Sequence, residues 1–203
     1  MKLAVKTFIE KINLLSEKDY MFNIIAYNIA PTIKGVKAAT TVTLCNYQRN
    51  LYDNWKKYKN DFLNKVNIKA FELNQTDNSV VVLFYDENLL NEKVNNQLSQ
   101  NFLLQFGYKF EMNLEEKLNL LKNRWLESIC PHEMGIFLGF PLEDVKTFIE
   151  SPNRECLLCG YWKVYYNKES AMEVFRCFDN AKLSIIKEIC KGKDLFEVLG
   201  KIA

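Results

Sequence analysis

The sequence predicts an α+β fold, in which a small, mostly antiparallel sheet is flanked by several helices within one compact domain over residues 1–203. The length of 203 residues and a hydrophobic content of 48% are sufficient for one sizeable core. Several long segments repeat their apolar residues with the three- and four-residue spacing of a helix face. Residues 68–73 and 79–85 are short and apolar and are separated by a polar turn, a pattern typical of an antiparallel hairpin.

Helices are expected wherever the apolar residues follow the helical period. In the first of them, Val5, Phe8 and Ile12 share one face, and Pro31 should end the second. Pro131 and Pro141 each suit the first position of a further helix. The predicted helices cover residues 3–15, 19–29, 47–66, 87–106, 114–129, short segments beginning at Pro131 and Pro141, 168–190 and 195–202.

Strands are expected where β-branched residues cluster or where apolar and polar residues alternate. Residues 40–45 are rich in threonine and valine, which favour extended backbone. The hairpin of residues 68–73 and 79–85 follows, and its second strand is apolar enough to be the central one. Residues 161–166 alternate like a further strand, and their outward-facing aromatic rings could contact a partner or a flat ligand.

Charge and hydropathy exclude two classes of partner. Lysine and arginine total 27 against 25 acidic residues, so a formal charge of +2 argues against a nucleic-acid-binding surface. No export signal follows the N-terminus, and the apolar runs fall short of the roughly 18 residues that cross a bilayer. We therefore expect a soluble, cytoplasmic protein. In a reducing compartment its 6 cysteines favour metal binding or redox chemistry over structural disulfides.

Three segments together resemble an uncharacterised bacterial family. They are residues 30–37 (APTIKGVK), residues 130–141 (CPHEMGIFLGFP) and residues 156–166 (CLLCGYWKVYY). In these segments the chain is similar to a domain-of-unknown-function family common in anaerobic Gram-positive bacteria, and the resemblance spans nearly its whole length. The resemblance implies a single cytoplasmic domain, and it supplies no activity.

The cysteine and histidine residues of residues 130–166 point to a metal centre. Cys130 would cap the helix that begins near Pro131, and His132 is the only histidine of the chain. Cys156 and Cys159 are spaced as in a metal-binding knuckle and precede a predicted strand. The four side chains would form a Cys₃His set for zinc or iron, with a structural role or an iron- or thiol-sensing one. Whether the protein is an enzyme stays open.

Other functions use the same residues. Cys156 and Cys159 could exchange a disulfide in a thiol oxidoreductase, with Cys130 as the resolving thiol. Cys130 or His132 could ligate haem iron. The pattern of a zinc-dependent nucleobase deaminase is not met, because Glu133 directly follows His132 instead of lying two residues on. An interaction module without a cofactor is a further alternative, with either a protein or a small flat ligand as its partner.

Overall fold

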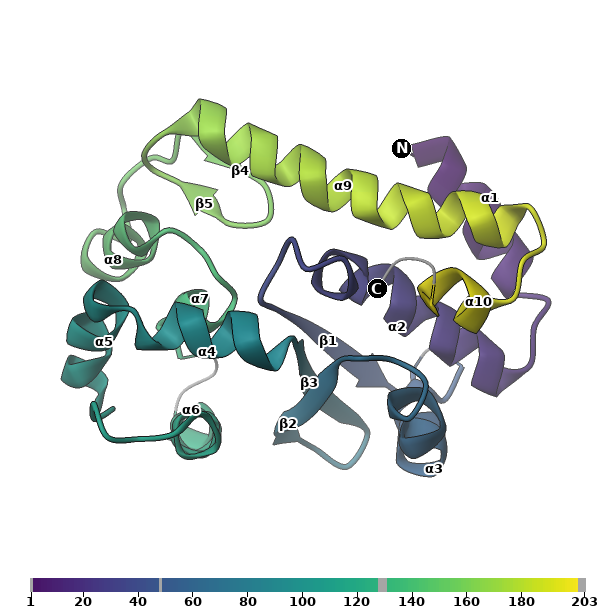
Figure 1. Ribbon diagram of the computed structural model, residues 1–203, viewed down its shortest axis with the longest axis horizontal. Coiled ribbons are helices and arrows are strands. Elements are labelled where there is room, and N and C mark those ends of the chain that lie inside the picture. The colour runs from purple at the N-terminus through teal and green to yellow at the C-terminus, as the bar shows by residue number, and fades with distance from the viewer. Residues whose placement is uncertain (1, 48, 128–130, 201–203) are drawn as a thin grey trace.

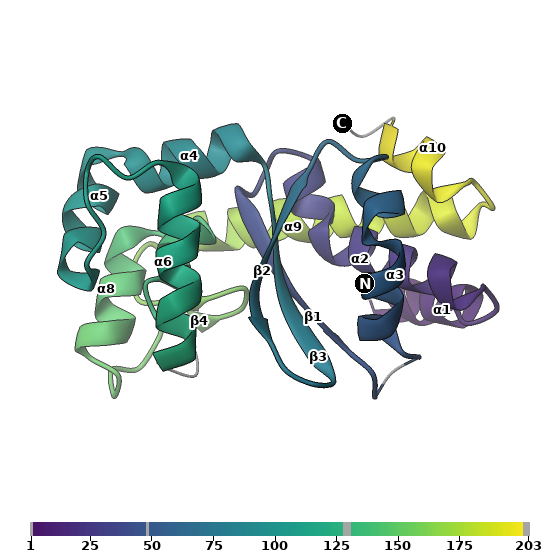
Figure 2. The same ribbon diagram turned by 90° about the horizontal axis from the view of Figure 1, so that it is seen from below.

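The structure is a computed structural model, and it describes residues 2–47, 49–127 and 131–200. Helices surround a small antiparallel sheet and a short hairpin, which confirms the predicted α+β class (Figure 1). Seen at right angles to that view, the sheet lies between two groups of helices (Figure 2). Within these residues, no helix is both long and apolar enough to cross a membrane.

The sheet has three antiparallel strands in the order β1-β3-β2. β3 (Ser79–Tyr85) is the central strand, as predicted, and it lies between β1 (Ala39–Cys45) and β2 (Lys69–Gln75). β1 and β3 pair without interruption along their whole length. The pairing of β2 with β3 shifts between Glu72 and Asn74, where β2 carries an irregularity of the bulge type.

Both faces of the central strand are buried, because successive side chains of a strand point to opposite sides. Val80, Val82 and Phe84 belong to one hydrophobic core, and Leu83 and Tyr85 belong to a second. The sheet therefore separates two cores, each covered by its own helices (Figure 2). This explains why residues 79–85 are apolar at nearly every position.

The first core is covered by helices from both ends of the chain. α2 (Glu17–Ile33) continues through Pro31, so the expectation that Pro31 ends this helix was wrong. The helix ends instead at a turn in which the carbonyl of Pro31 accepts bonds from the amides of Val36 and Lys37 and Gly35 adopts a positive φ of 66°. The helices of this side are α1 (Lys2–Ile12), α2 (Glu17–Ile33), α3 (Leu51–Leu63), α9 (Lys168–Cys190) and α10 (Leu195–Gly200).

The second core is covered by the helices of the middle of the chain. The single helix predicted over residues 87–106 is broken at Asn96, whose backbone is extended and whose side chain accepts a bond from the amide of Ser99. Asparagine favours such a cap because its side chain replaces the missing helical acceptor. The elements are α4 (Glu87–Asn95), α5 (Gln97–Leu103), the 3₁₀ turn η1 (Leu104–Phe106), α6 (Leu114–Glu127), α7 (Met134–Phe137) and α8 (Leu142–Glu150).

Two other predicted helices begin later than expected. α3 begins at Leu51 and not at residue 47, because Arg49 and Asn50 adopt positive φ angles that a helix does not allow. The helix expected from Pro131 is a turn followed by α7, which begins only at Met134. Cys130, the expected cap of that helix, lies outside the described residues.

A short hairpin and the long helix α9 connect the two sides of the molecule. β4 (Leu158–Cys159) and β5 (Lys163–Val164) pair antiparallel, so the strand predicted over residues 161–166 forms only at its centre. α9 covers residues 168–190 as predicted. It begins beside the hairpin and runs along the molecule to α1 (Figure 1).

Candidate functional site

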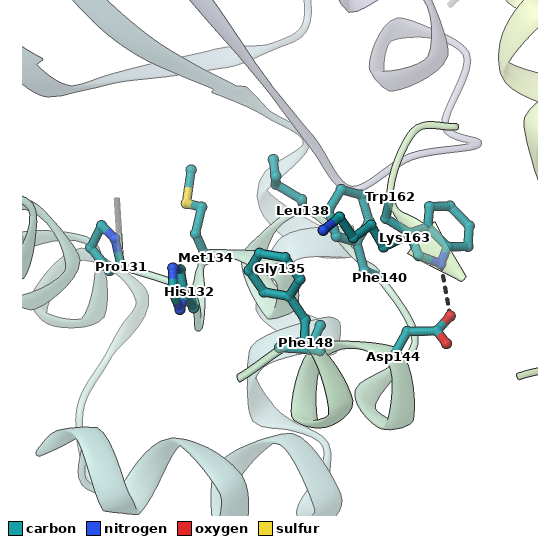
Figure 3. A pocket seen from close by; sticks show the side chains of 11 residues that line it. Pro131, His132, Met134, Gly135, Leu138, Phe140, Asp144, Phe148, Trp162 and Lys163 are labelled. Atoms are coloured by element: carbon teal, nitrogen blue, oxygen red, sulfur yellow. Dashed lines mark hydrogen bonds between the residues drawn. The ribbon is translucent and has the colours of Figure 1, made fainter. Parts of the chain in front are cut away.

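A pocket of about 320 Å³ lies where α7, α8 and the β4–β5 hairpin meet (Figure 3). In Figure 3, His132 and Met134 lie at one end of the pocket, and Trp162 and Asp144 lie at the other. Most of the lining side chains are apolar, and several are aromatic. The residues that line it are Pro131, His132, Met134, Gly135, Leu138, Phe140, Asp144, Val145, Phe148, Trp162 and Lys163.

A buried ion pair fixes the segment that forms one end of the pocket. Glu133, whose side chain is 1% exposed, accepts a hydrogen bond from Nε of Arg124 on α6. A second contact, from Nη2 of Arg124 to Oε2 of Glu133, measures 3.4 Å. Burial, and next the charge of Glu133, raise the pKa of the neighbouring Tyr108 above its ordinary value. The pair thus anchors the turn that carries His132 to the second core.

A glycine allows α7 to approach α8 closely. A Cβ atom added at Gly135 would lie 2.7 Å from Cγ2 of Val145, which is shorter than any normal contact. Only a residue without a side chain fits at this position, so α7 and α8 can form one continuous wall of the pocket.

Asp144 joins α8 to the hairpin at the other end of the pocket. Its side chain is buried, and its Oδ2 accepts a hydrogen bond of 2.7 Å from the indole Nε1 of Trp162. Its Oδ1 accepts bonds of 2.7 Å and 3.2 Å from the backbone amides of Tyr165 and Tyr166. Asp144 also lies in the first turn of α8, where the exposed helix amides favour a negative charge. With these contacts its carboxylate holds the hairpin in place.

Trp162 is further fixed by aromatic rings on both sides. It stacks on Phe140 with ring centroids 5.2 Å apart and meets the edge of Phe175 on α9 at 4.6 Å. Gly160 permits this packing, because an added Cβ atom would lie 2.2 Å from Cε2 of Phe175. The aromatic wall is therefore held in place by packing against its neighbours.

Two groups that can carry a positive charge flank Phe148 at the pocket. The imidazole of His132 meets the ring edge-on at 5.0 Å, and Nζ of Lys163 lies 5.4 Å from its centroid. Both residues are exposed. Neither has an ion pair with any residue that the structure describes. The pocket thus combines apolar aromatic walls with an imidazole and an ammonium group that reach solvent.

The structure separates the predicted metal ligands into different surroundings. His132 lines the pocket, whereas Cys156 is half-buried, Cys159 is exposed on β4, and neither lines it. Both cysteines are free thiols. Over residues 2–47, 49–127 and 131–200, no three His, Cys, Asp or Glu side chains are grouped closely enough to hold a metal ion. The complete set includes Cys130, outside those ranges, so zinc or iron at this set remains a prediction.

Several pocket residues were not singled out from the sequence. Asp144 is one of them, because nothing in the local sequence shows that a carboxylate will meet residues 18 or more positions away. Trp162 belongs to residues 161–166, whose outward-facing aromatic rings were expected to contact a partner or a flat ligand, and it lines the pocket. The signal that could have found the site is the density of prolines, glycines and aromatic residues in residues 131–166.

Comparison with known proteins identifies a family but no activity. A family model described as "Protein of unknown function (DUF3793)" matches residues 25–199. That span contains every residue of the pocket and the three segments on which the resemblance to an uncharacterised family was based. No curated protein matches the chain, and no solved structure does.

Proposed function

We propose a ligand-binding function for this chain, which belongs to the DUF3793 family of proteins of unknown function. The ligand class is a small, flat, apolar molecule that carries an acidic group. The observation that carries this proposal is the aromatic pocket of about 320 Å³ between α7, α8 and the hairpin, with His132 and Lys163 beside it. Pockets of this kind, apolar with a few polar groups, are where small molecules bind most often.

The shape and chemistry of the walls define the apolar part of the ligand. Phe140, Phe148 and Trp162 offer ring faces and edges, which favour offset or edge-on contact with another planar ring. A volume of about 320 Å³ lies at the lower end of the range of roughly 300–1,000 Å³ for ligand pockets. The pocket therefore favours a ligand of a few fused or linked rings over a larger one.

The imidazole of His132 and the ammonium group of Lys163 define the polar part of the ligand. The carboxylate of Asp144 is occupied by three N–H donors, so it does not offer a counter-charge to a cationic ligand. His132 and Lys163 are exposed and have no ion-pair partner among the described residues, and a carboxylate or sulfonate of the ligand could approach both of them. Because they are exposed, the expected contribution of each to binding is small, about 0.2–1 kcal/mol.

A pair of fluorescent probes tests this proposal. Anilinonaphthalene sulfonate has two linked aromatic units and a negative charge, and phenylnaphthylamine has the same rings without the charge. We expect saturable, one-to-one binding of both probes to the native protein and a rise of its Tm with the sulfonate, as linkage requires. No binding by the folded protein, or binding without a rise in Tm, would reject the proposal, since the sulfonate also binds partly folded chains.

Matched variants locate the binding. Phe148→Ala should weaken the binding of both probes about 10-fold or more, which corresponds to about 1.4 kcal/mol per factor of ten. The control Leu157→Ala removes an exposed apolar side chain of the hairpin region and should not weaken binding. Lys163→Gln should weaken the sulfonate about two- to fivefold and leave phenylnaphthylamine unchanged. Lys168→Gln removes the same charge at the start of α9, away from the pocket lining, and should change neither.

The metal and redox functions predicted from the sequence remain alternatives to this proposal. Analysis of freshly purified protein for zinc and iron tests the Cys₃His set of Cys130, His132, Cys156 and Cys159. Thiol titration before and after a mild oxidant tests disulfide exchange between Cys156 and Cys159. Titration with haemin separates haem from other flat ligands, because ligation by His132 or Cys130 would shift the haem absorbance.

A further inference from the structure

Two half-buried lysines, neither of which lines the pocket described above, contact one aromatic cluster from different segments of the chain. Lys37 follows α2, and its Nζ lies 5.6 Å from the ring centroid of Phe140 and 5.7 Å from that of Phe178. Lys182 lies on α9, and its Nζ is 5.0 Å from the ring centroid of Tyr161. The rings of Phe178 and Tyr161 are themselves in contact, with centroids 5.0 Å apart.

Neither amine forms an ion pair with a residue that the structure describes, although the charge of Asp179 acts on Lys182 from farther away. No Asp or Glu of the described part of the chain lies within ion-pair distance of Lys37 or Lys182. Asp179, the acid closest in sequence to Lys182, accepts a hydrogen bond of 2.8 Å from the hydroxyl of Tyr161. Burial, and next the charge of Lys182, lower the pKa of Lys37 to about 8. Burial also lowers the pKa of Lys182, and the charge of Asp179 opposes this shift in part. The charge of Lys37 is thus disfavoured in a partly desolvated place.

The backbone amides of the loop before Lys37 are already bonded, so the lysine side chains, and not these amides, can donate hydrogen bonds to a ligand between α2 and α9. The amides of Lys34, Gly35, Val36 and Lys37 all bond to carbonyls at the end of α2, so the loop is a helix terminus rather than a cradle of free amides. Each lysine Nζ, in contrast, retains N–H donors that have no acceptor among the described residues. Two ammonium groups match the charge of a phosphate group, which is about −1.5 to −2 at neutral pH.

We infer that Lys37 and Lys182 form a second binding site, which takes a phosphate group carried either as the free ion or as a phosphomonoester. The ion would bind between the end of α2, α9 and the hairpin and would add negative charge beside both amines. The aromatic rings of Phe140, Phe178 and Tyr161 would hold the two stems in place and restrict access of water. The site is distinct from the pocket, whose lining includes neither lysine.

Thermal unfolding in phosphate tests the inference. Inorganic phosphate and glycerol phosphate are each titrated against the wild-type protein, with sodium chloride of matched ionic strength as the reference. We expect a saturable rise in Tm of about 3–6 °C at ten times the Kd over the chloride reference. A response to inorganic phosphate alone would restrict the site to the free ion, and a response to both would extend it to phosphomonoesters. No rise beyond chloride with either compound would overturn the inference.

Variants and side-chain resonances locate the effect. Lys37→Gln and Lys182→Gln should each abolish the rise in Tm, whereas Lys187→Gln, an exposed lysine of the same helix, should keep it. Because Lys37→Gln could unfold the chain, the wild-type lysine Cε signals provide a second readout. The Lys37 and Lys182 signals should shift on addition of phosphate and the Lys187 signal should not. Equal shifts of all three signals, or a rise in Tm that survives both substitutions, would show that phosphate does not bind at these two lysines and would overturn the inference.

Discussion

Replacing Asp144 should destabilise the protein more than any other single change at the pocket. Its buried carboxylate accepts two bonds of 2.7 Å and one of 3.2 Å from groups of the hairpin and the segment after it. Hydrogen bonds to a charged group contribute about 1.5–3 kcal/mol each. Asp144→Asn places an amide where one oxygen accepts, so it loses at least one bond and should lower the free energy of unfolding by about 2 kcal/mol.

Asp144→Ala removes all three acceptors and leaves their N–H groups without partners. Each buried unsatisfied donor costs about 1–3 kcal/mol, and because the three share one carboxylate the losses do not add fully, so we expect about 4 kcal/mol. This is a large share of a total stability of about 5–15 kcal/mol. Urea denaturation followed by circular dichroism measures the loss, with Glu143→Gln as the control for an exposed acid in the same turn. A loss below about 0.5 kcal/mol in Asp144→Asn would refute the role assigned to this carboxylate.

Three further predictions concern the surroundings of the pocket and the sheet. Gly160→Ala should lower the free energy of unfolding by about 1–3 kcal/mol and weaken probe binding, because its methyl group would lie 2.2 Å from Phe175. In the control Gly200→Ala, where nothing lies within 4 Å, stability should not change. Equal denaturation midpoints for the two variants would contradict this. Glu133→Gln should lower the free energy of unfolding by about 3 kcal/mol, because it breaks the buried ion pair with Arg124. If the exposed control Glu115→Gln lowers the stability equally, the pair is unimportant. Burial acts to raise the pKa of Glu72, but the hydrogen bonds from Lys59 and Trp55 outweigh it and leave that pKa below its ordinary value. The stabilising contribution of Glu72 should therefore be present above about pH 4.3 and be lost as the pH falls through the lowered pKa. The difference in unfolding free energy between wild type and Glu72→Gln should then be larger at about pH 6 than at about pH 3. A constant difference would oppose this assignment.

The sequence predicted the elements whose stability depends on their own pattern. The central strand and α9 have the bounds that periodicity indicates, because β3 is buried on both faces and α9 keeps one apolar face over many turns. The errors occurred where a local signal competes with tertiary packing. Pro31 does not end α2, since this last turn is packed in the first core, and Asn96 breaks an otherwise continuous helical pattern by capping α5.

The pocket lies within the segment that the sequence analysis singled out, but its construction was not predicted. Residues 130–166 do contain the pocket, and His132 and Trp162 do line it. The cysteines drew attention because their chemistry is distinctive, yet Cys156 and Cys159 lie outside the lining. Asp144 is decisive for the geometry because it bonds to residues of another element, and such a long-range contact leaves no periodic trace in the sequence.

The most direct test of ligand binding in the pocket uses the indole N–H signals of the three tryptophans in a nitrogen-labelled sample. Trp162 lines the pocket, whereas Trp55 is buried against Glu72 on the other side of the sheet and Trp125 lies on α6. On addition of anilinonaphthalene sulfonate, the Trp162 signal should shift in a saturable manner while the Trp55 and Trp125 signals stay in place. A Trp162 signal that does not move at saturating probe would contradict the proposed site.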